Sequence, residues 1–195
     1  MIYGDGDCRT RLIQPTQKAA RLISVVGRNE GVSDIVIRKA KTDDCEVIVS
    51  FIRMMLKEMS DMGGHTENKN DSFWKSFIDI VLPAIENSER LYLIAENNDG
   101  PVGFFEGRVN MLYEVFEPKK SFHINSVYVI PEKRNNGIAK SLIRAALRWA
   151  SEKGCQEADL NILINNKNAK SLYGSFGFTV FQNEMRMQLP TSQFR

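Results

Sequence analysis

The sequence predicts a mixed α/β domain in which helices cover both faces of a central, mostly antiparallel sheet. Three observations support this fold class. Apolar residues first recur at helical spacing and later alternate as they do in strands. Two alternating runs are joined by a segment that ends in Asp99-Gly100, a pair typical of hairpin turns, so these two strands should run antiparallel. A later strand leads through a Gly-containing turn directly into another helix.

The regular part of the chain is predicted to begin with one strand and two helices. Residues 35–38 alternate as a strand, and residues 42–44 offer Thr and Asp side chains that can cap the following helix. Apolar residues at helical spacing continue that helix until Gly63-Gly64. A second helix is expected over about residues 72–85, with Pro83 as an interruption near its end.

The rest of the chain is predicted to add strands, two helices and a closing hairpin. The longer helix starts at Ile138, carries one apolar face and is expected to end at Gly154. In chain order, we expect strands at 91–96, 102–109 and 122–129, the helix from 138, a strand at 158–164, a short helix at 169–176, and a hairpin of 179–181 with 185–189.

The composition is that of one ordinary globular domain. The chain has 195 residues, 43% of them hydrophobic, and its 26 Lys and Arg against 24 Asp and Glu give a formal net charge of +2. Because there is no basic excess, we expect no general nucleic-acid binding. No apolar run approaches the roughly 20 residues of a membrane span, and the first residues lack the apolar core of a signal peptide. We therefore expect no membrane partner and a cytoplasmic location.

The three cysteines, Cys8, Cys45 and Cys155, lie far apart, with no CxxC pair and no neighbouring His. This spacing argues against a disulfide framework and against a zinc site, so a reducing compartment and no metal are expected.

Residues 1–33 differ from the remainder and are interpreted as an N-terminal extension to which the sequence assigns no role. They include a candidate short helix at 15–23, with Thr16 as its N-cap and an end near Gly27. The regular domain is expected to span residues 34–190.

The segment from Val127 to Lys140 has the features of an anion-binding site. A strand ends there, a turn follows, and a helix begins, so unpaired backbone N–H groups and the positive end of the helix dipole face outward. Small residues at Gly137 and Ala139 would let a diphosphate approach the backbone, and Arg134 and Lys140 add positive charge. The alternative is an exposed basic turn without a ligand. Neither GxxxxGK(S/T) nor GxGxxG occurs, which disfavours P-loop hydrolysis and dinucleotide binding.

Two motifs give the sequence a family resemblance. The loop Arg134-Asn135-Asn136-Gly137-Ile138-Ala139 matches Arg/Gln-x-x-Gly-x-Gly/Ala, and the segment from Asn166 to Phe178 matches Asn-x-x-Ala-x-x-Leu-Tyr-x-x-x-Gly-Phe. In this order they resemble the GNAT superfamily of acyl-CoA-dependent N-acyltransferases, over roughly residues 35–189. The sequence departs from the family pattern at Asn135, where Gly is common, and at Gly174-Ser175, where longer polar residues are usual.

The resemblance implies a GNAT fold, with the sheet splayed in its middle and acetyl-CoA held in the opening as acyl donor. The pantetheine arm would pair with the backbone of the strand 122–129, and Asn166 would hydrogen-bond it, unless Asn166 is simply a turn residue. The implied cofactor-binding residues are Val127, Tyr128, Val129, Arg134, Asn135, Asn136, Gly137, Ile138, Ala139, Lys140, Asn166 and Tyr173.

The same resemblance suggests how protons are moved. Helical periodicity alone would place Tyr173 in the core, whereas the family's Tyr at this place can protonate the departing CoA thiolate. An amine acceptor must lose a proton before it attacks, and His123 is the first candidate base because it lies on the strand expected to pair with the cofactor. Glu106 on the neighbouring strand is the second candidate, and Glu114 is the third.

Acceptor recognition is expected at the first two helices and the loop between them. This edge is rich in Met, which adapts to irregular ligands, although Met at helical spacing is also common core filling. The residues concerned are Met54, Met55, Met59, Met62, Gly63, Gly64 and His65.

The function expected from the resemblance is direct transfer of an acetyl group from acetyl-CoA to a primary amine, most simply that of a small molecule. Two alternatives remain open, a non-catalytic acyl-CoA sensor of the same fold and an acetyltransferase for protein or peptide amines. Transfer onto aminoacyl-tRNA or a ribosomal protein would need a basic patch, whereas the charge here is scattered. The expected partners are acetyl-CoA and the amine, and a homodimer is the one assembly considered.

Overall fold

The computed structural model of the protein describes residues 35–111 and 120–187. Two short 3-10 helices, at Thr42–Asp44 and Pro131–Lys133, lead into longer elements. The helices and strands follow in the order β1 (Val36–Lys39), α1 (Cys45–Asp61), α2 (Asp71–Glu86), β2 (Arg90–Asn97), β3 (Gly100–Met111), β4 (Lys120–Val129), α3 (Ile138–Glu152), β5 (Glu157–Leu160) and α4 (Lys167–Gly174).

The strands form one mixed sheet in the spatial order β1-β2-β3-β4-β5. Neighbouring strands pair antiparallel from β1 to β4, and β5 pairs parallel to β4. The β2–β3 hairpin closes between Asn97 and Gly100, and Gly100 has a φ of +122° that a residue with a side chain rarely adopts. The predicted mixed, mostly antiparallel sheet is therefore confirmed.

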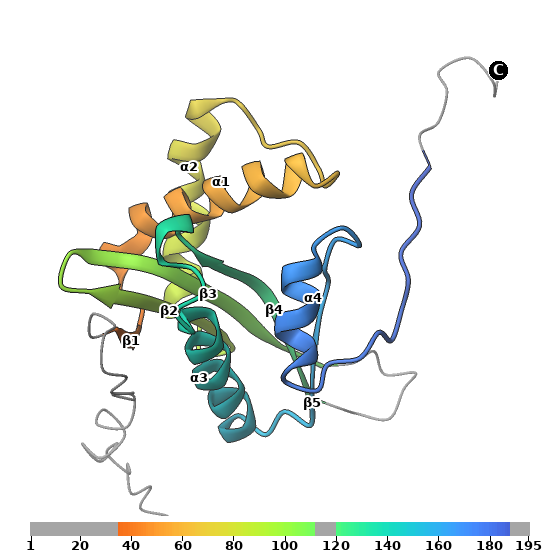
Figure 1. The fold of residues 1–195 in the computed structure, drawn as a ribbon. Coiled ribbons are helices and arrows are strands. Elements are labelled where there is room, and N and C mark those ends of the chain that lie inside the picture. The colour runs from red at the N-terminus through yellow and green to blue at the C-terminus, as the bar shows by residue number, and fades with distance from the viewer. Residues whose placement is uncertain (1–34, 112–119, 188–195) are drawn as a thin grey trace, which may run out of the picture.

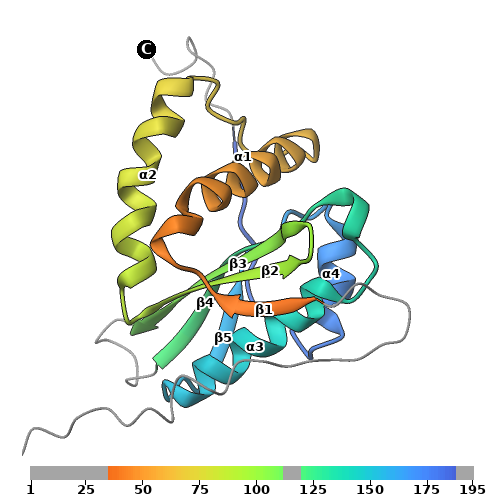
Figure 2. The same ribbon diagram turned by 90° about the vertical axis from the view of Figure 1, so that its left-hand side faces the viewer.

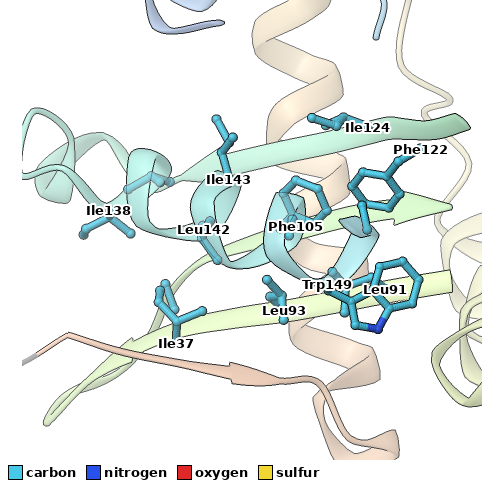
Figure 3. Close-up of a cluster of buried hydrophobic side chains, with 14 of the residues drawn as sticks. Ile37, Leu91, Leu93, Phe105, Phe122, Ile124, Ile138, Leu142, Ile143 and Trp149 are labelled. Carbon is cyan, nitrogen blue, oxygen red and sulfur yellow. The ribbon is translucent and has the colours of Figure 1, made fainter. Parts of the chain in front are cut away.

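Helices cover both faces of the sheet. Figures 1 and 2 show α1 and α2 on one face, and α3 on the other face with α4 beside it. On the α3 side, the helix packs Leu142 and Ile143 against the sheet, and Trp149 contacts the buried ring of Phe122 at 5.6 Å between centroids (Figure 3). Phe122 in turn stacks on Phe105 at 6.0 Å. Because these aromatic side chains are fully or almost fully buried, they anchor α3 to the centre of the sheet.

A second apolar core lies between the sheet and the first two helices. Phe51 of α1 stacks on Phe104 of β3, with ring centroids 5.9 Å apart. The start of α1 is fixed by Arg38 of β1, whose two terminal nitrogens donate to both oxygens of Asp44 at 2.7 and 2.8 Å. This bidentate contact lowers the pKa of Asp44. Asp44 is the N-cap residue of α1, as expected for this segment, but its side chain makes no capping hydrogen bond to the helix and accepts instead from the backbone N–H of Lys41.

The sheet opens between β4 and β5. Residues 121–124 of β4 pair with residues 157–160 of β5, and no described strand pairs with residues 125–129 on that side. A β-bulge lies at the same place, because Glu106 is opposite Ser126 while Gly107 is opposite Ile124, which leaves Asn125 extra. The splay implied by the family resemblance is therefore present.

The strand expected at 158–164 is shorter than predicted and ends at Leu160. The alternation continues through Ile162 and Ile164, but the chain turns away from β4, and Ile164 is 92% exposed. The alternation of apolar residues therefore predicted too long a strand, because a strand also requires a neighbouring strand with which to pair.

The predicted closing hairpin is wrong for the described residues. Residues 178–187 contain no strand, and Val180, Phe181, Met185 and Met187 are mostly exposed, with no strand alongside to pair with. The remaining hairpin residues, 188 and 189, lie outside the described residues, as do the candidate helix at 15–23, Cys8 and Glu114.

In the parts of the chain that the structure describes, no helix has both the length and the apolar character needed to cross a membrane.

Two glycines should respond oppositely to the same substitution. A Cβ on Gly107 would lie 2.5 Å from Cζ of Phe122, whereas a Cβ on Gly174, in α4, would meet no atom within 4 Å. Gly107→Ala should lower the free energy of unfolding by about 1 to 3 kcal/mol through overpacking. Gly174→Ala should raise it by about 0.5 to 1 kcal/mol, because alanine loses less backbone entropy in a helix. Urea unfolding of both variants checks this, and equal effects would contradict the described packing around Gly107.

Candidate active site

The site is built at the end of β4, where the chain passes through Pro131–Lys133 and a short loop into α3. The loop turns through two left-handed residues, Asn135 with φ +64° and Gly137 with φ +74°. Asn135 is the one described non-glycine residue with positive φ, and Asn tolerates this region better than most residues. Asn135 therefore occupies a left-handed conformation, the region that glycine adopts without steric cost.

The N-terminus of α3 is left open. Gly137 is its N-cap, and among the described residues no side chain caps the helix and no atom lies within 4 Å of a Cβ placed on Gly137. Ile138 is buried in the core and fixes the first turn, while Lys140 in the same turn is exposed. The first-turn N–H groups and the positive end of the helix dipole are therefore available to an anion.

Arg134 is turned away from this open end. Its Nη2 donates to both carboxylate oxygens of Glu58, in α1, at 2.7 and 2.9 Å, and its Nε donates to the carbonyl of Val129 at 2.8 Å. The guanidinium also lies over the ring of Tyr128, 5.4 Å from the ring centroid. Arg134 thus joins α1 to the loop, and Glu58 balances the positive charge that the sequence led us to expect at the anion site.

The strand residues before the loop point to both sides of the sheet. Val127 and Val129 contact the core beneath α3, and Tyr128 contacts the opposite core beneath α1. The Tyr128 hydroxyl donates to Glu58 at 3.2 Å, and burial is the main cause that raises its pKa. Arg134 already occupies the carbonyl of Val129, so the backbone edge over residues 125–129 is only partly free.

Asn166 and Tyr173 lie at opposite ends of α4. Oδ1 of Asn166 accepts from the backbone N–H of Ala169 at 3.0 Å, so Asn166 is the N-cap of α4, and its Nδ2 has no partner among the described residues. Tyr173 is 8% exposed and packs edge-on against Phe178, with ring centroids 5.6 Å apart. Its hydroxyl contacts no described hydrogen-bond partner, and burial raises its pKa to about 12.

His123 lies opposite Asp159 across the parallel β4–β5 pair, and its Nδ1 is 2.5 Å from Oδ1 of Asp159. If the shared proton lies on Nδ1, Nε2 is the ring nitrogen that can accept another proton. Sequence reasoning missed Asp159. A charged residue inside an otherwise apolar strand was the available signal, but the pairing of residues 36 positions apart was not.

Glu106 lies on the same face of the sheet as His123. One of its carboxylate oxygens accepts from Ser126 Oγ at 3.4 Å, and the other lies 3.7 Å from Nη1 of Arg90. Tyr92, opposite Glu106 on β2, has its pKa raised, first by burial and next by the Glu106 charge. Both candidate bases within the described residues thus lie on the face covered by α1 and α2.

Tyr173 lies on the other face, in the core beneath α3. A ligand held in the opening between β4 and β5 would therefore have the His123 and Glu106 face on one side and Tyr173 on the other.

The Met-rich edge expected from the sequence is formed by the end of α1 and the following turn. This turn contacts the segment after β5, because Asn165 Nδ2 donates to the carbonyl of Met62 at 3.3 Å.

An open helix N-terminus at the end of a strand that parts from its neighbour is an arrangement found in a class of α/β proteins that bind phosphate-bearing ligands. Comparison with known proteins narrows the class. The sequence profile of the Acetyltransferase (GNAT) family matches residues 52–178. The chain belongs to this family and is an N-acetyltransferase of GNAT type.

Proteins of similar sequence include N-acetyltransferases of a bacterium and of a mammal. The N-acetyltransferase YhfO of Bacillus subtilis is 30% identical over 148 residues, which cover 73% of this chain and 88% of YhfO. The thialysine N-epsilon-acetyltransferase of Sus scrofa is 26% identical over 155 residues, covering 75% of this chain and 85% of that enzyme.

Solved structures share the fold. A mutant form of the BH1408 protein of Bacillus halodurans superposes with a TM-score of 0.71 at 16% identity, over 80% of this chain and 99% of that chain. The aminoglycoside N-acetyltransferase AAC(6')-Iy, in complex with the bisubstrate analogue CoA-S-monomethyl-acetylneamine, gives a TM-score of 0.64 at 18% identity, over 81% of this chain and 99% of that chain.

The Tyr173 hydroxyl should stay mostly protonated at about pH 11, because its pKa is raised to about 12 whereas an exposed tyrosine has a pKa near 10. Since the unfolded chain ionises first, Tyr173 should also lower the free energy of unfolding as the pH rises from about 10 towards 12. Ultraviolet difference titration against Tyr173→Phe measures the ionisation. A tyrosinate step near pH 10 that is lost in Tyr173→Phe would contradict the described burial.

Proposed function

We propose that the protein transfers an acetyl group from acetyl-CoA directly to the primary amine of a small molecule. The observation that carries the proposal is the opening between β4 and β5, which leads along β4 to the open N-terminus of α3. Named relatives add support for a small-molecule acceptor, because they include acetyltransferases for thialysine and for aminoglycosides.

Acetyl-CoA fits the opening in two parts. The pantetheine arm carries amides and would pair with the backbone of β4 over residues 125–129 as an added strand, with Nδ2 of Asn166 as a further donor. The diphosphate would lie against the first turn of α3, where Gly137 leaves the backbone uncovered and Lys140 supplies positive charge. Arg134 would hold the loop in place through its contacts with Glu58 and Val129.

The reaction needs one proton to leave the amine and one to reach the thiolate. His123, oriented by Asp159, would accept the amine proton at Nε2, and Glu106 is the alternative acceptor on the same face. The amine nitrogen then attacks the thioester carbonyl carbon, and the carbon–sulfur bond breaks as the tetrahedral intermediate collapses. The Tyr173 hydroxyl keeps its proton at neutral pH, so it is available to the departing sulfur.

A thiol-release assay with acetyl-CoA and a panel of primary amines tests the function. Release of free CoA that depends on the amine, together with an acetylated product detected by mass spectrometry, is the expected result. Calorimetric binding of acetyl-CoA without release in the presence of any amine would instead indicate an acyl-CoA sensor and would contradict the proposal.

The open backbone at Gly137 should matter for CoA affinity more than for folding. Gly137→Ala and Gly154→Ala place the same methyl group at similar positive φ values, +74° and +79°, and neither Cβ meets an atom within 4 Å. Both should lose about 1 to 2 kcal/mol of folding free energy through left-handed strain. We expect only Gly137→Ala to weaken CoA binding in calorimetry, by at least about 10-fold. Equal CoA affinity in the two variants would refute a diphosphate site at the loop.

Removing the proposed acid and removing the proposed base should have different effects on the kinetic constants. Tyr173→Phe should lower kcat by about 100- to 10,000-fold while leaving acetyl-CoA binding nearly unchanged. His123→Ala should lower kcat/KM most at neutral pH and recover partly at alkaline pH, where the amine loses its proton without help. Asp159→Asn should lower kcat/KM by about 10- to 100-fold, because the ring loses its orienting partner.

Steady-state pH profiles distinguish these outcomes. If His123→Ala retains both the rate and the pH profile, His123 is not the base, and the same profile of Glu106→Gln then tests the second candidate. Full kcat in Tyr173→Phe would show that the hydroxyl is not needed and that Tyr173 is a core aromatic residue.

A further inference from the structure

Polar side chains form a continuous row across the sheet beside the opening. Arg90 of β2 is opposite Arg108 of β3, Arg108 is opposite His123 of β4, and His123 is opposite Asp159 of β5. Directly paired residues place their side chains on the same face of a sheet. Arg90 has the same strand parity as Tyr92, which lies in the core beneath α1 and α2, so the row is on the face that carries the candidate bases.

The two arginines of the row differ in their partners. Arg90 Nη1 lies 3.7 Å from Glu106 and donates to the Tyr92 hydroxyl at 3.4 Å. No hydrogen bond or ion pair of Arg108 occurs within the described ranges, and its Nε is buried without a partner. Like charges directly opposite each other destabilise a sheet, and a buried donor without an acceptor costs further free energy. Among the described residues, therefore, nothing offsets the cost of the buried Nε of Arg108 or of its position opposite Arg90.

We propose that Arg108 binds a carboxylate of the acceptor, so that the substrate is an amine that also carries a carboxylate, as amino acids do. A guanidinium matches a carboxylate in shape and charge, and its planar fork of N–H donors can bind both carboxylate oxygens. The inference rests on the proposed function and specifies its substrate class.

The order of charges along the row supports a dipolar ligand. Two guanidiniums lie at one end, and the carboxylate of Asp159 lies at the other, with His123 between Arg108 and Asp159. Neighbouring strands are about 4.8 Å apart, so Arg108 on β3 and His123 on β4 are about one strand spacing apart, which is the scale of the separation between carboxylate and amine in a small amino acid. The acceptor carboxylate then lies over β3, and its amine lies over β4 beside His123 and the opening.

The test uses amines in pairs that differ only in the carboxylate: lysine with cadaverine, ornithine with putrescine, and leucine with 3-methylbutylamine. In at least one pair, kcat/KM with acetyl-CoA should favour the carboxylate-bearing amine by about 10- to 100-fold, the effect of one charge-assisted hydrogen bond. Arg108→Met should bring this ratio to within about 3-fold. Arg148→Met provides the matched control, because Arg148 is exposed on α3 on the other face, and should leave the ratio as it is.

A stability measurement separates recognition from a structural role. Because Arg108→Met removes a buried unpaired donor and a like-charge contact, its Tm should equal or exceed that of the unaltered protein. A clearly lower Tm would indicate that Arg108 supports the fold and would overturn the proposal.

The outcomes of the kinetic test are distinct. Turnover without preference for the carboxylate in any pair, or an equal loss on both members of a pair in Arg108→Met, would overturn the carboxylate site while leaving the acetyltransferase function intact. Absence of amine-dependent turnover with every amine would overturn both.

Discussion

The loss of pairing between β4 and β5 is the constraint on which the rest of the site depends. A strand in the interior of a sheet normally has hydrogen-bonding neighbours on both sides, yet among the described strands β4 has a neighbour on only one side after Ile124. The bulge at Asn125 falls at the same point and changes which side chains face each core. As a result, one strand presents a partly free backbone edge, leads at its end to a helix whose N-cap is Gly137, and carries candidate bases on one face. The same sheet could not offer this arrangement if β5 remained paired along its whole length.

Much of the fold could be predicted because its signals are local. The hairpin at Asp99-Gly100, the apolar face of α3 and the end of α1 at Gly63-Gly64 each depend on residues within a few positions of one another. The loop from Arg134 to Ala139 could also be predicted from the sequence, since its glycine and the helix that follows are adjacent in sequence. Local propensity and final structure agree at these places, so pattern alone was sufficient.

What could not be predicted depends on contacts between distant residues. Ile162 and Ile164 continue the alternation of β5, but they could form a strand only beside a pairing strand, and no described strand pairs with them. The same reason explains the missing hairpin at 179–187. The pairing of Asp159 with His123 and of Glu58 with Arg134 joins residues 36 and 76 positions apart, for which a single sequence contains no signal. The proton-transfer roles of His123, Glu106 and Tyr173 remain predictions.

The contact between Glu58 and Arg134 also makes the loop sensitive to the surrounding electrolyte. Both side chains are well exposed, 38% and 40%, and exposed ion pairs weaken as dissolved salt screens their charges. The pair joins α1, on the face that carries the candidate bases, to the loop proposed to receive the diphosphate. If that proposal holds, concentrated salt would act on this protein twice, by weakening the attraction of the helix N-terminus for an anion and by loosening the contact that holds that terminus in place. Rates measured in dilute and in concentrated buffers would therefore differ partly because the Glu58–Arg134 contact holds the loop less firmly at high salt.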